Sequence, residues 1–353
     1  MIKMKNSRLI YILIVILAIW LAVVTSNFNR ASKNENQNII NEYNVTGFST
    51  DFTRIADEVK PCMVAINADG NILSGFIYKQ DGDDVYVVTA YHGVASAINI
   101  NVYFASSYTV EGELYNYDIY TDIAVIKVNT PYEMQTLTIG DSNTLKAGEF
   151  IISMGTPTSL DYAFSVELGM ISHENLFIEN TISVEEDRIS YYLNALELSS
   201  NLQYGYSGSP VINMNGEFVG MNTMNLNLSS TFSFAITSNE IKIVVDKIIN
   251  GEEIHRNNIG IKGEFVSDMY NYEKSNLNIP IDTIEGLYVS KEKENSLAFS
   301  AGIRSGDIIQ KINSIEINNF NDYLDALYSE VTDDFIFEYI HNGELVVAGA
   351  IYD

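Results

Sequence analysis

The sequence predicts an all-β domain of barrel or sandwich type, followed by a smaller α+β domain and preceded by a membrane-spanning helix. From Val64 to Thr237, short runs rich in Val, Ile, Tyr and Phe alternate with clusters of Gly, Asn and Asp, which is typical of antiparallel β-structure. A mixed pattern of helix and strand fills residues 258–353. Near the N-terminus, Leu9 to Val24 is continuously apolar.

The apolar N-terminal run predicts a membrane anchor within residues 1–29. At 1.5 Å per helical residue, Leu9 to Val24 together with Thr25 to Phe28 just spans a hydrocarbon layer about 30 Å thick. The basic residues Lys3, Lys5 and Arg8 precede the run, so the N-terminus is expected to stay cytoplasmic and the rest to lie outside. The alternative is a signal peptide cleaved near Thr25. We favour a retained single-pass anchor, because the run is long for a signal peptide.

The pattern after the anchor divides the chain into a linker and two domains. Residues 30–47 are polar and Asn-rich and predict a flexible spacer. Residues 48–251 form the predicted β-domain, with a short helix from about Asp51 that Pro61 stops. A capping box, Thr237 to Glu240, opens a second helix that Gly251 closes. The α+β domain covers residues 258–353.

Five apolar runs are the clearest strands, and one dipeptide predicts a hairpin. The runs are Val85–Thr89, Ile98–Phe104, Ile123–Val128, Phe150–Met154 and Phe232–Ile236. Asn215-Gly216, between two further apolar runs, is a strong signal for a two-residue turn.

Composition excludes several classes of protein. Cys62 is the only cysteine, so no intramolecular disulfide can form, and its apolar neighbours predict a buried thiol. All five charged residues before Glu35 are basic, which leaves 15 Lys and Arg against 46 Asp and Glu in the remainder. So acidic a body is repelled by nucleic acid. We expect no nucleic-acid partner, and no metal or cofactor.

The segment Gln203 to Pro210 (QYGYSGSP) has the composition of a nucleophile loop. A serine hydrolase needs a base for its serine, a carboxylate to orient the base, and backbone donors for the oxyanion. Ser207 lies between two glycines, which allow a tight turn that aims the N–H groups of Gly205 and Ser207 at one oxygen. Taken alone, Gly-x-Ser-Gly is equally common in ordinary turns.

A histidine and an aspartate complete a candidate triad. His92 follows an apolar strand in VVTAYHGV, and Asp122 precedes another in TDIAVIKV. Asp118 is the rival carboxylate. His92, Asp122 and Ser207 occur in the order His–Asp–Ser, with separations of 30 and 85 residues.

These motifs together resemble HtrA-type (DegP-like) proteases. VVTAYHGV is similar to that family's V-[LI]-T-N-x-H-V-V, TDIAVIKV to its T-D-[LI]-A-V-[LI]-K-[IV], and YGYSGSPVINMNGEFVGMNT to its serine motif. The resemblance extends from about Ala56 to the C-terminus. It implies a trypsin-like double β-barrel with His92, Asp122 and Ser207 as the catalytic triad.

Three positions depart from the family pattern. Gly93 replaces an apolar residue, Tyr206 replaces Asn or Asp, and Ser209 replaces the second glycine of G-G-P. A serine at this last position also occurs in secreted glutamyl endopeptidases, which are the alternative within the same class. The second domain argues against them, because those enzymes lack one.

Residues 258–353 resemble a PDZ domain. The segment Ser296 to Asn313 (SLAFSAGIRSGDIIQKIN) matches the PDZ pattern, and Asn258-Ile259-Gly260-Ile261 resembles the loop that binds a peptide carboxylate in the family. The resemblance implies binding of C-terminal peptides, with the side chains of Ile259 and Ile261 lining a pocket for an apolar last residue. It also implies unfolded envelope proteins as substrates and a homotrimer.

Two hypotheses remain from different classes. The first is an active serine endopeptidase regulated by its PDZ domain. The second is a holding chaperone or peptide-binding adaptor in which the barrel is only a scaffold. The complete triad favours the first, because a scaffold would be free to lose it.

Overall fold

The computed structural model describes residues 20, 21, 25, 45–184, 187–200, 202–223, 232–330 and 335–350. Most of the predicted anchor, Leu9 to Val24, and most of the predicted linker lie outside these residues. Among those described, no helix has the length and apolarity needed to cross a membrane. The chain divides into two units, Met1–Asp51 and Phe52–Asp353.

Six strands close into a first barrel in the order β1-β2-β3-β6-β5-β4. Their bounds are β1 Met63–Ala68, β2 Asn71–Asp81, β3 Asp84–Ala90, β4 Ile100–Phe104, β5 Thr109–Asp118 and β6 Ile123–Asn129. Alternate residues of these strands fill an aliphatic core that includes Val64, Val87 and Ile126, all at most 1% exposed. The predicted strand at Ile98 begins two residues later.

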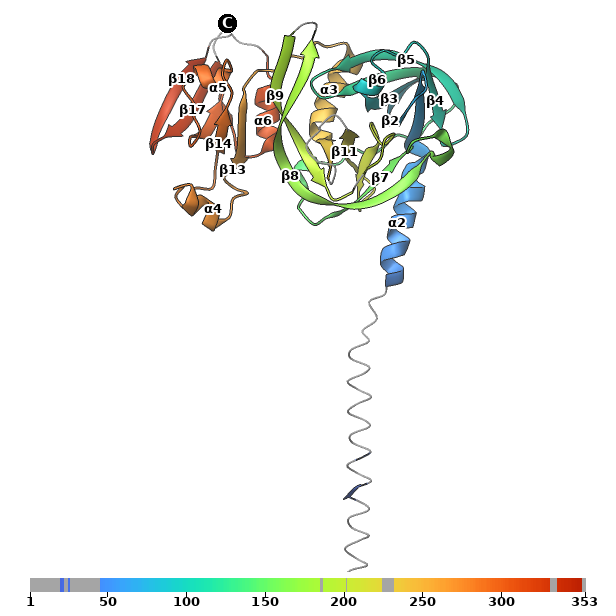
Figure 1. Ribbon diagram of the computed structural model, residues 1–353, viewed down its shortest axis with the longest axis horizontal. Helices are drawn as coiled ribbons and strands as arrows, with labels where there is room; N and C mark the ends of the chain where they lie inside the picture. Colours follow the sequence, from blue (N-terminus) through green and yellow to red (C-terminus); the bar gives the residue numbers. More distant parts are fainter. Residues whose placement is uncertain are drawn as a thin grey trace, which may run out of the picture. The chain divides into compact units, whose positions relative to one another are not determined.

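A second barrel closes in the order β10-β11-β12-β9-β8-β7. Figure 1 labels β7, β8, β9 and β11 of this barrel. Its strands are β7 Phe150–Gly155, β8 Ser165–Val184, β9 Asp187–Leu198, β10 Pro210–Asn213, β11 Phe218–Thr223 and β12 Ser233–Thr237. The predicted hairpin at Asn215-Gly216 connects β10 to β11. Asn213 and Glu217 close this loop through a backbone hydrogen bond of 2.9 Å.

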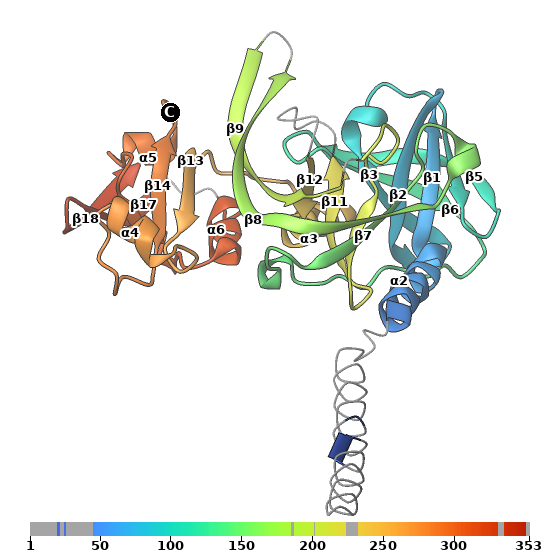
Figure 2. The same ribbon diagram turned by 60° about the horizontal axis from the view of Figure 1, so that its bottom comes forward.

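The strands β8 and β9 form an unusually long hairpin (Figure 2). Their pairing continues from Ile171↔Leu198 to Val184↔Asp187, with irregular register between Ile171 and Leu176. The outer half of the hairpin leaves the barrel and contacts the C-terminal domain. There the Phe177 ring of β8 packs edge-on against Phe320 and Tyr323, with centroid distances of 6.1 and 5.3 Å.

The C-terminal domain is a sheet with short helices. The strands are β13 Ile261–Phe265, β14 Leu287–Glu292, β15 Ile308–Ile312, β16 Ile315–Glu316, β17 Phe335–His341 and β18 Glu344–Ala350. The order is β13-β14-β15-β17-β18, with β16 paired to β15, so β13 is an edge strand. The helices are α4 Asn271–Asn276, α5 Leu297–Ser300 and α6 Phe320–Leu327. This α+β arrangement is consistent with a PDZ domain.

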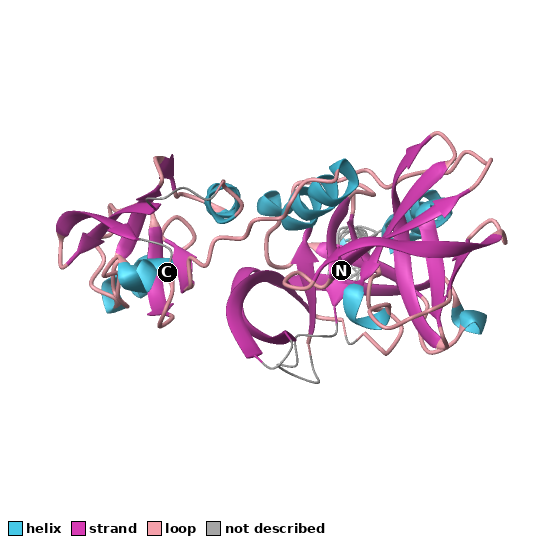
Figure 3. Ribbon diagram, turned by 90° about the horizontal axis from the view of Figure 1, so that it is seen from above, coloured by secondary structure: helices cyan, strands magenta, loops and turns pink. Residues whose placement is uncertain are grey.

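Outside the C-terminal domain, the residues that the structure describes form few helices (Figure 3). The helix α2, Val45–Val59, precedes the first barrel, and four single 3₁₀ turns occur at Lys60–Cys62, Tyr91–Gly93, Ser142–Thr144 and Leu160–Tyr162. Cys62 is buried, as predicted, and burial raises the pKa of its thiol to about 11.

The helix α3, Ser238–Asn250, corrects one prediction. It ends at Gly251 in the left-handed conformation, as expected. However, Thr237 makes no capping hydrogen bond, and its buried hydroxyl has no partner in the structure. The predicted capping box is wrong because the Glu240 side chain is bound to Arg256 instead of the helix N-terminus. The Ser238 hydroxyl anchors the helix start by donating to the Gly140 carbonyl at 2.7 Å.

Candidate active site

Strand pairing brings His92 and Asp122 together, although 30 residues separate them. β3 and β6 are antiparallel neighbours, and their last register pair is Ala90↔Ile123. His92 lies in the 3₁₀ turn that follows β3, and Asp122 is the residue just before β6. The two side chains therefore emerge at the same rim of the first barrel.

Asp122 holds His92 through both of its carboxylate oxygens. Oδ1 accepts the His92 backbone N–H at 2.8 Å, and Oδ2 lies 2.7 Å from His92 Nδ1. The Asp122 side chain is 5% exposed, whereas that of His92 is 34% exposed. The remaining ring nitrogen, Nε2, makes no hydrogen bond to the described residues. This arrangement orients the imidazole with Nδ1–H toward the carboxylate and Nε2 as the proton acceptor.

The environment of His92 favours its protonated form. Burial of the ring opposes the charge, but the hydrogen bond and the negative charge of Asp122 outweigh it and raise the pKa of His92. A base with a raised pKa accepts a proton from a serine more readily.

Ser207 comes from the loop that precedes β10 in the second barrel. Gly205 and Gly208 both have positive φ angles, +100° and +82°. A Cβ at Gly205 would lie 2.2 Å from the Thr156 carbonyl oxygen, and one at Gly208 would lie 2.3 Å from the Ser74 carbonyl oxygen. Both positions therefore require glycine, for conformation and for space.

Two backbone donors remain unused in this loop. Gly205 N–H and Ser207 N–H donate to no acceptor among the described residues, although both residues are buried. Three other N–H groups of the loop are used: Tyr206 donates to Gln203, Gly208 to Asn222 and Ser209 to Tyr206. Because buried donors are almost always paired, this pair of N–H groups is available to an incoming oxyanion.

Two residues that the sequence analysis did not single out support the site. Thr223, at the end of β11, donates its hydroxyl to Asp122 Oδ2 at 2.7 Å. Ser74 of β2 donates its hydroxyl to the Gly205 carbonyl at 2.7 Å, and its N–H donates to the Ser207 carbonyl at 3.0 Å. Ser74 thus ties the nucleophile loop to the first barrel. Thr223 is the last residue of the serine motif quoted above, so its position in that motif could have indicated a role in the site.

The structure accommodates each of the three departures from the family pattern. A side chain at Gly93 would meet Leu73, because a Cβ there would lie 2.0 Å from Leu73 Cδ2. The buried Tyr206 ring fills the space beside Gly155, where a Cβ would lie 2.6 Å from it.

The hydroxyl of Ser209, the third departure, is satisfied by a hydrogen bond. Its hydroxyl is buried and lies 2.9 Å from Asn222 Nδ2, which also donates to the Ser153 hydroxyl at 3.0 Å. The side chain therefore points away from the nucleophile into a polar cluster between β7 and β11.

Asp118 takes a different place from Asp122. Its Oδ2 accepts the backbone N–H and the hydroxyl of Thr121, at 2.9 and 2.5 Å. It is bonded within its own turn, without contact to His92. Asp122, by contrast, has a left-handed φ of +56°, which is costly for a residue other than glycine.

The predicted carboxylate loop, Asn258 to Ile261, lies at the start of β13. Gly260 has a φ of +72°, and a Cβ there would lie 2.1 Å from Ser296 Cβ. The side chains of Ile259 and Ile261 are both fully buried. Ile259 borders a cavity of about 180 Å³ that Tyr191 of β9 also lines. The Asn258 amide donates to the Asn295 carbonyl at 3.1 Å.

Two closed six-stranded barrels, with the His92–Asp122 pair on one and a serine loop on the other, define a trypsin-like serine peptidase domain. Residues 73–221 match the family model of the trypsin-like peptidase domain. The chain is also similar to Serine protease Do-like HtrA of Lactococcus lactis subsp. lactis (29% identity over 270 residues, 74% of this chain and 65% of that protein). It is 30% identical to Serine protease Do-like HtrB of Bacillus subtilis over 262 residues, 73% of this chain and 56% of that protein. Residues 73–221 thus have the fold and the family match of a trypsin-like peptidase domain, and the curated relatives that the chain resembles are HtrA-type serine proteases.

Solved structures show the same fold at lower identity. A serine endoprotease from Yersinia pestis is 22% identical, with a TM-score of 0.53. The HtrA-type protease AlgW, solved with a tripeptide, is 20% identical, with a TM-score of 0.58. Each comparison covers 85% of this chain and 96% of the other, so the likeness includes the C-terminal domain. The chain spans between about half and two thirds of the length of the two curated relatives named above.

Proposed function

We propose that this protein is a serine endopeptidase that works through an acyl-enzyme. The observation that carries the proposal is the orientation of His92 by both oxygens of Asp122, together with the two unused N–H groups around Ser207. Ser207 is the nucleophile, His92 the general base, and Asp122 the group that fixes the histidine tautomer. The N–H groups of Gly205 and Ser207 form the oxyanion hole.

The chemistry then follows from the geometry. Ser207 Oγ attacks the scissile carbonyl carbon while His92 Nε2 takes its proton. The carbonyl oxygen becomes an oxyanion held by the two N–H groups, and loss of one such donor typically costs on the order of 10²–10³ in kcat. The tetrahedral intermediate collapses as the imidazolium protonates the leaving amine. Water, activated by His92, then releases the acyl group from Ser207.

One feature favours the scaffold hypothesis and sets a condition on the mechanism. Among the described residues, Ser207 Oγ makes no hydrogen bond to His92. In uncomplexed enzymes this contact is often long and tightens when substrate binds. We therefore place the Ser207–His92 hydrogen bond in the substrate complex. Casein digestion by the full-length chain in detergent tests the proposal, and lack of digestion with no labelling by a fluorophosphonate would favour the adaptor.

Unfolded or mislocalised envelope proteins are the proposed substrates, and the resemblance to HtrA-type relatives supports this. The test compares the digestion of a reduced, unfolded protein with that of the same protein in its folded, disulfide-bonded form. Preferential cleavage of the unfolded form is expected. Cleavage confined to glutamyl bonds of folded substrates would instead support the glutamyl-endopeptidase alternative.

The proposed location is outside the cytoplasm, attached to the cell membrane by residues 9–24. The basic residues Lys3, Lys5 and Arg8 before that run support this orientation. We expect the protein to remain in the membrane pellet after carbonate extraction and to be digested by protease added outside the cell. Recovery of a soluble form beginning near Asn27 would show a cleaved signal instead. A homotrimer is proposed by analogy with the family.

The C-terminal domain is proposed to bind peptides through their free C-terminal carboxylate. The edge strand β13 and the left-handed Gly260 support this, because a peptide can add to such an edge while backbone N–H groups hold its carboxylate. A peptide that ends in an apolar residue should bind the full-length chain more tightly than its C-terminal amide. Fluorescence anisotropy measures both. Equal affinity for acid and amide would contradict the assignment of residues 258–261.

A further inference from the structure

The segment that carries Asp122 needs support from outside its own turn. Asp122 has the strained φ of +56°, and such conformations persist only where the surroundings hold them. On one side, Asp118 fixes Thr121 through two hydrogen bonds. On the other side, the Tyr120 carbonyl points toward the long β8–β9 hairpin.

Tyr191 of β9 binds that carbonyl. Its hydroxyl donates to the Tyr120 carbonyl oxygen and accepts from the Asn180 amide at 2.8 Å. The Tyr191 and Tyr120 rings also pack edge to face, 5.2 Å apart. Burial raises the pKa of Tyr191, which keeps the hydroxyl protonated and able to donate. Tyr191 therefore fixes the backbone two residues before Asp122.

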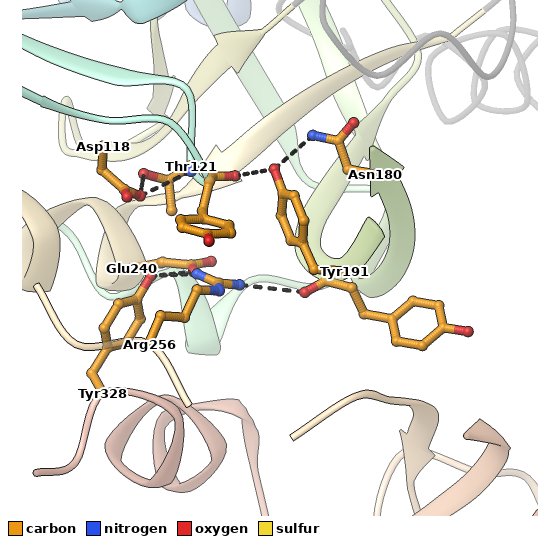
Figure 4. A network of polar contacts seen from close by, with 9 residues as sticks. Asp118, Thr121, Asn180, Tyr191, Glu240, Arg256 and Tyr328 are labelled. Atoms are coloured by element: carbon orange, nitrogen blue, oxygen red, sulfur yellow. Dashed lines mark hydrogen bonds and ion pairs between the residues drawn. The ribbon is translucent and has the colours of Figure 1, made fainter. Parts of the chain in front are cut away.

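Arg256, in the connection between the two domains, fixes Tyr191 in turn (Figure 4). Its guanidinium lies 5.7 Å from the centre of the Tyr191 ring and donates to the Tyr192 carbonyl at 3.3 Å. The same guanidinium donates to Glu240 of α3 and to the hydroxyl of Tyr328, just after α6. Tyr328 also donates to Glu240 at 2.7 Å.

This cluster of charges is strongly desolvated. The Glu240 side chain is fully buried and that of Arg256 is 9% exposed. A buried ion pair of this kind is maintained only while its partners stay in place. Because Glu240 belongs to the protease domain and Tyr328 to the C-terminal domain, the cluster of Arg256, Glu240 and Tyr328 is complete only when the two domains are in contact.

The packing around Tyr120 is incomplete on one side. The cavity of about 180 Å³ borders Tyr120, Tyr191 and Arg256, and it also borders Asn258 and Gly260 of the predicted carboxylate loop. A void on one side removes the contacts that would otherwise restrain a side chain. The hydrogen bond from Tyr191 is therefore a specific restraint on this side of the segment, in addition to the packing of the Tyr120 ring.

We propose that Tyr191 is a positioning residue for Asp122, and that contact with the C-terminal domain, through Tyr328 and Arg256, keeps it in place. This inference rests on the proposed function. Docking of the C-terminal domain thereby supports a catalytically competent Asp122. Displacement of that domain loosens the Tyr120–Asp122 segment and weakens the hold on His92.

The test compares Tyr191→Phe and Tyr328→Phe with wild type in the full-length chain, with a fluorophosphonate as the probe. Tyr191→Phe should lower the maximal rate of Ser207 labelling about tenfold, as loss of one buried hydrogen bond implies, with the inhibition constant unchanged. The acid limb of the pH profile of the labelling rate should move to lower pH in Tyr191→Phe. The reason is that a less well held Asp122 raises the pKa of His92 less. Tyr328→Phe should also lower the labelling rate and move the acid limb to lower pH, but both changes should be smaller than in Tyr191→Phe.

The control is Tyr339→Phe in the C-terminal sheet. The Tyr339 hydroxyl also donates to a buried backbone carbonyl, that of Ala301 at 3.1 Å, but lies outside the cluster. The Tyr339→Phe variant should match wild type in the rate of Ser207 labelling and in the pH profile of that rate. If Tyr191→Phe behaves like this control in both respects, the proposal is wrong.

A second measurement separates this inference from the proposed function. The low-field proton resonance of His92 Nδ1–H reports the bond to Asp122 whether or not the protein cleaves anything. We expect its titration midpoint to fall in Tyr191→Phe and to stay constant in Tyr339→Phe. If wild type proves inactive, the proposed function fails, while this resonance still supports or overturns the positioning role.

Discussion

Ser207→Ala should abolish nearly all peptidase activity, with a loss in kcat on the order of 10⁵–10⁶, and His92→Ala should cost about as much. The two losses are equal because nucleophile and base act as one unit, so removal of either leaves only binding and the oxyanion hole. Digestion of fluorescent casein by the full-length chain measures both variants. Their unfolding temperatures should stay close to that of wild type, since neither side chain belongs to the hydrophobic core.

Labelling by a fluorophosphonate identifies the nucleophile directly. Ser207→Ala should take up no label, and mass spectrometry of the wild type should place the label on Ser207. Ser290→Ala, which alters an exposed serine of β14, is the control and should label normally. Label on any other serine, or casein digestion that survives in Ser207→Ala, would refute the assignment of the nucleophile.

The candidate catalytic residues could be proposed from the sequence because their signals are local. His92, Asp122 and Ser207 each lie in a short segment in which strand ends, glycines and small residues are themselves characteristic. The structure brings His92 and Asp122 into contact through the register of β3 and β6, which a strand pattern alone does not reveal. The triad order and the family resemblance supplied that missing information.

The supporting residues were harder to find, because their roles depend on distant partners. Ser74 looks like an ordinary strand residue, and only the closed structure shows it bonded to Gly205, 131 residues away. The capping box failed for the same reason. Glu240 has the local position of a capping residue, but burial beside Arg256 offers its charge a stronger partner.

The contact between the β8–β9 hairpin and the C-terminal domain also could not be predicted from the sequence. In the sequence, Phe177 is one apolar residue within a predicted strand. In the structure it packs on Phe265 of the edge strand β13 and on Phe320 of α6. A peptide that adds to β13 would approach this same face. Aromatic contacts between domains have no local periodicity, so no pattern along the chain predicts them.

Asp122→Asn should lower kcat about 10⁴-fold, the usual cost of a wrong histidine tautomer. Both carboxylate oxygens of Asp122 are acceptors in the structure: Oδ1 for the His92 N–H, and Oδ2 for the ring and for the Thr223 hydroxyl. An asparagine can accept with only one of the two atoms. If its amide nitrogen faces the ring, it donates to Nδ1 and places the remaining proton on Nε2, where the base must be unprotonated.

The opposite orientation of the asparagine does not rescue the site. Its amide N–H₂ would then face the His92 backbone N–H, and two donors would oppose each other at a buried position. Asp118→Asn is the matched comparison, because it makes the same substitution four residues away. There a single oxygen, Oδ2, accepts both bonds from Thr121, and an asparagine carbonyl can replace it, so the loss should stay within about tenfold. Casein digestion by both variants measures the difference, and a greater loss in Asp118→Asn would make Asp118 the orienting carboxylate.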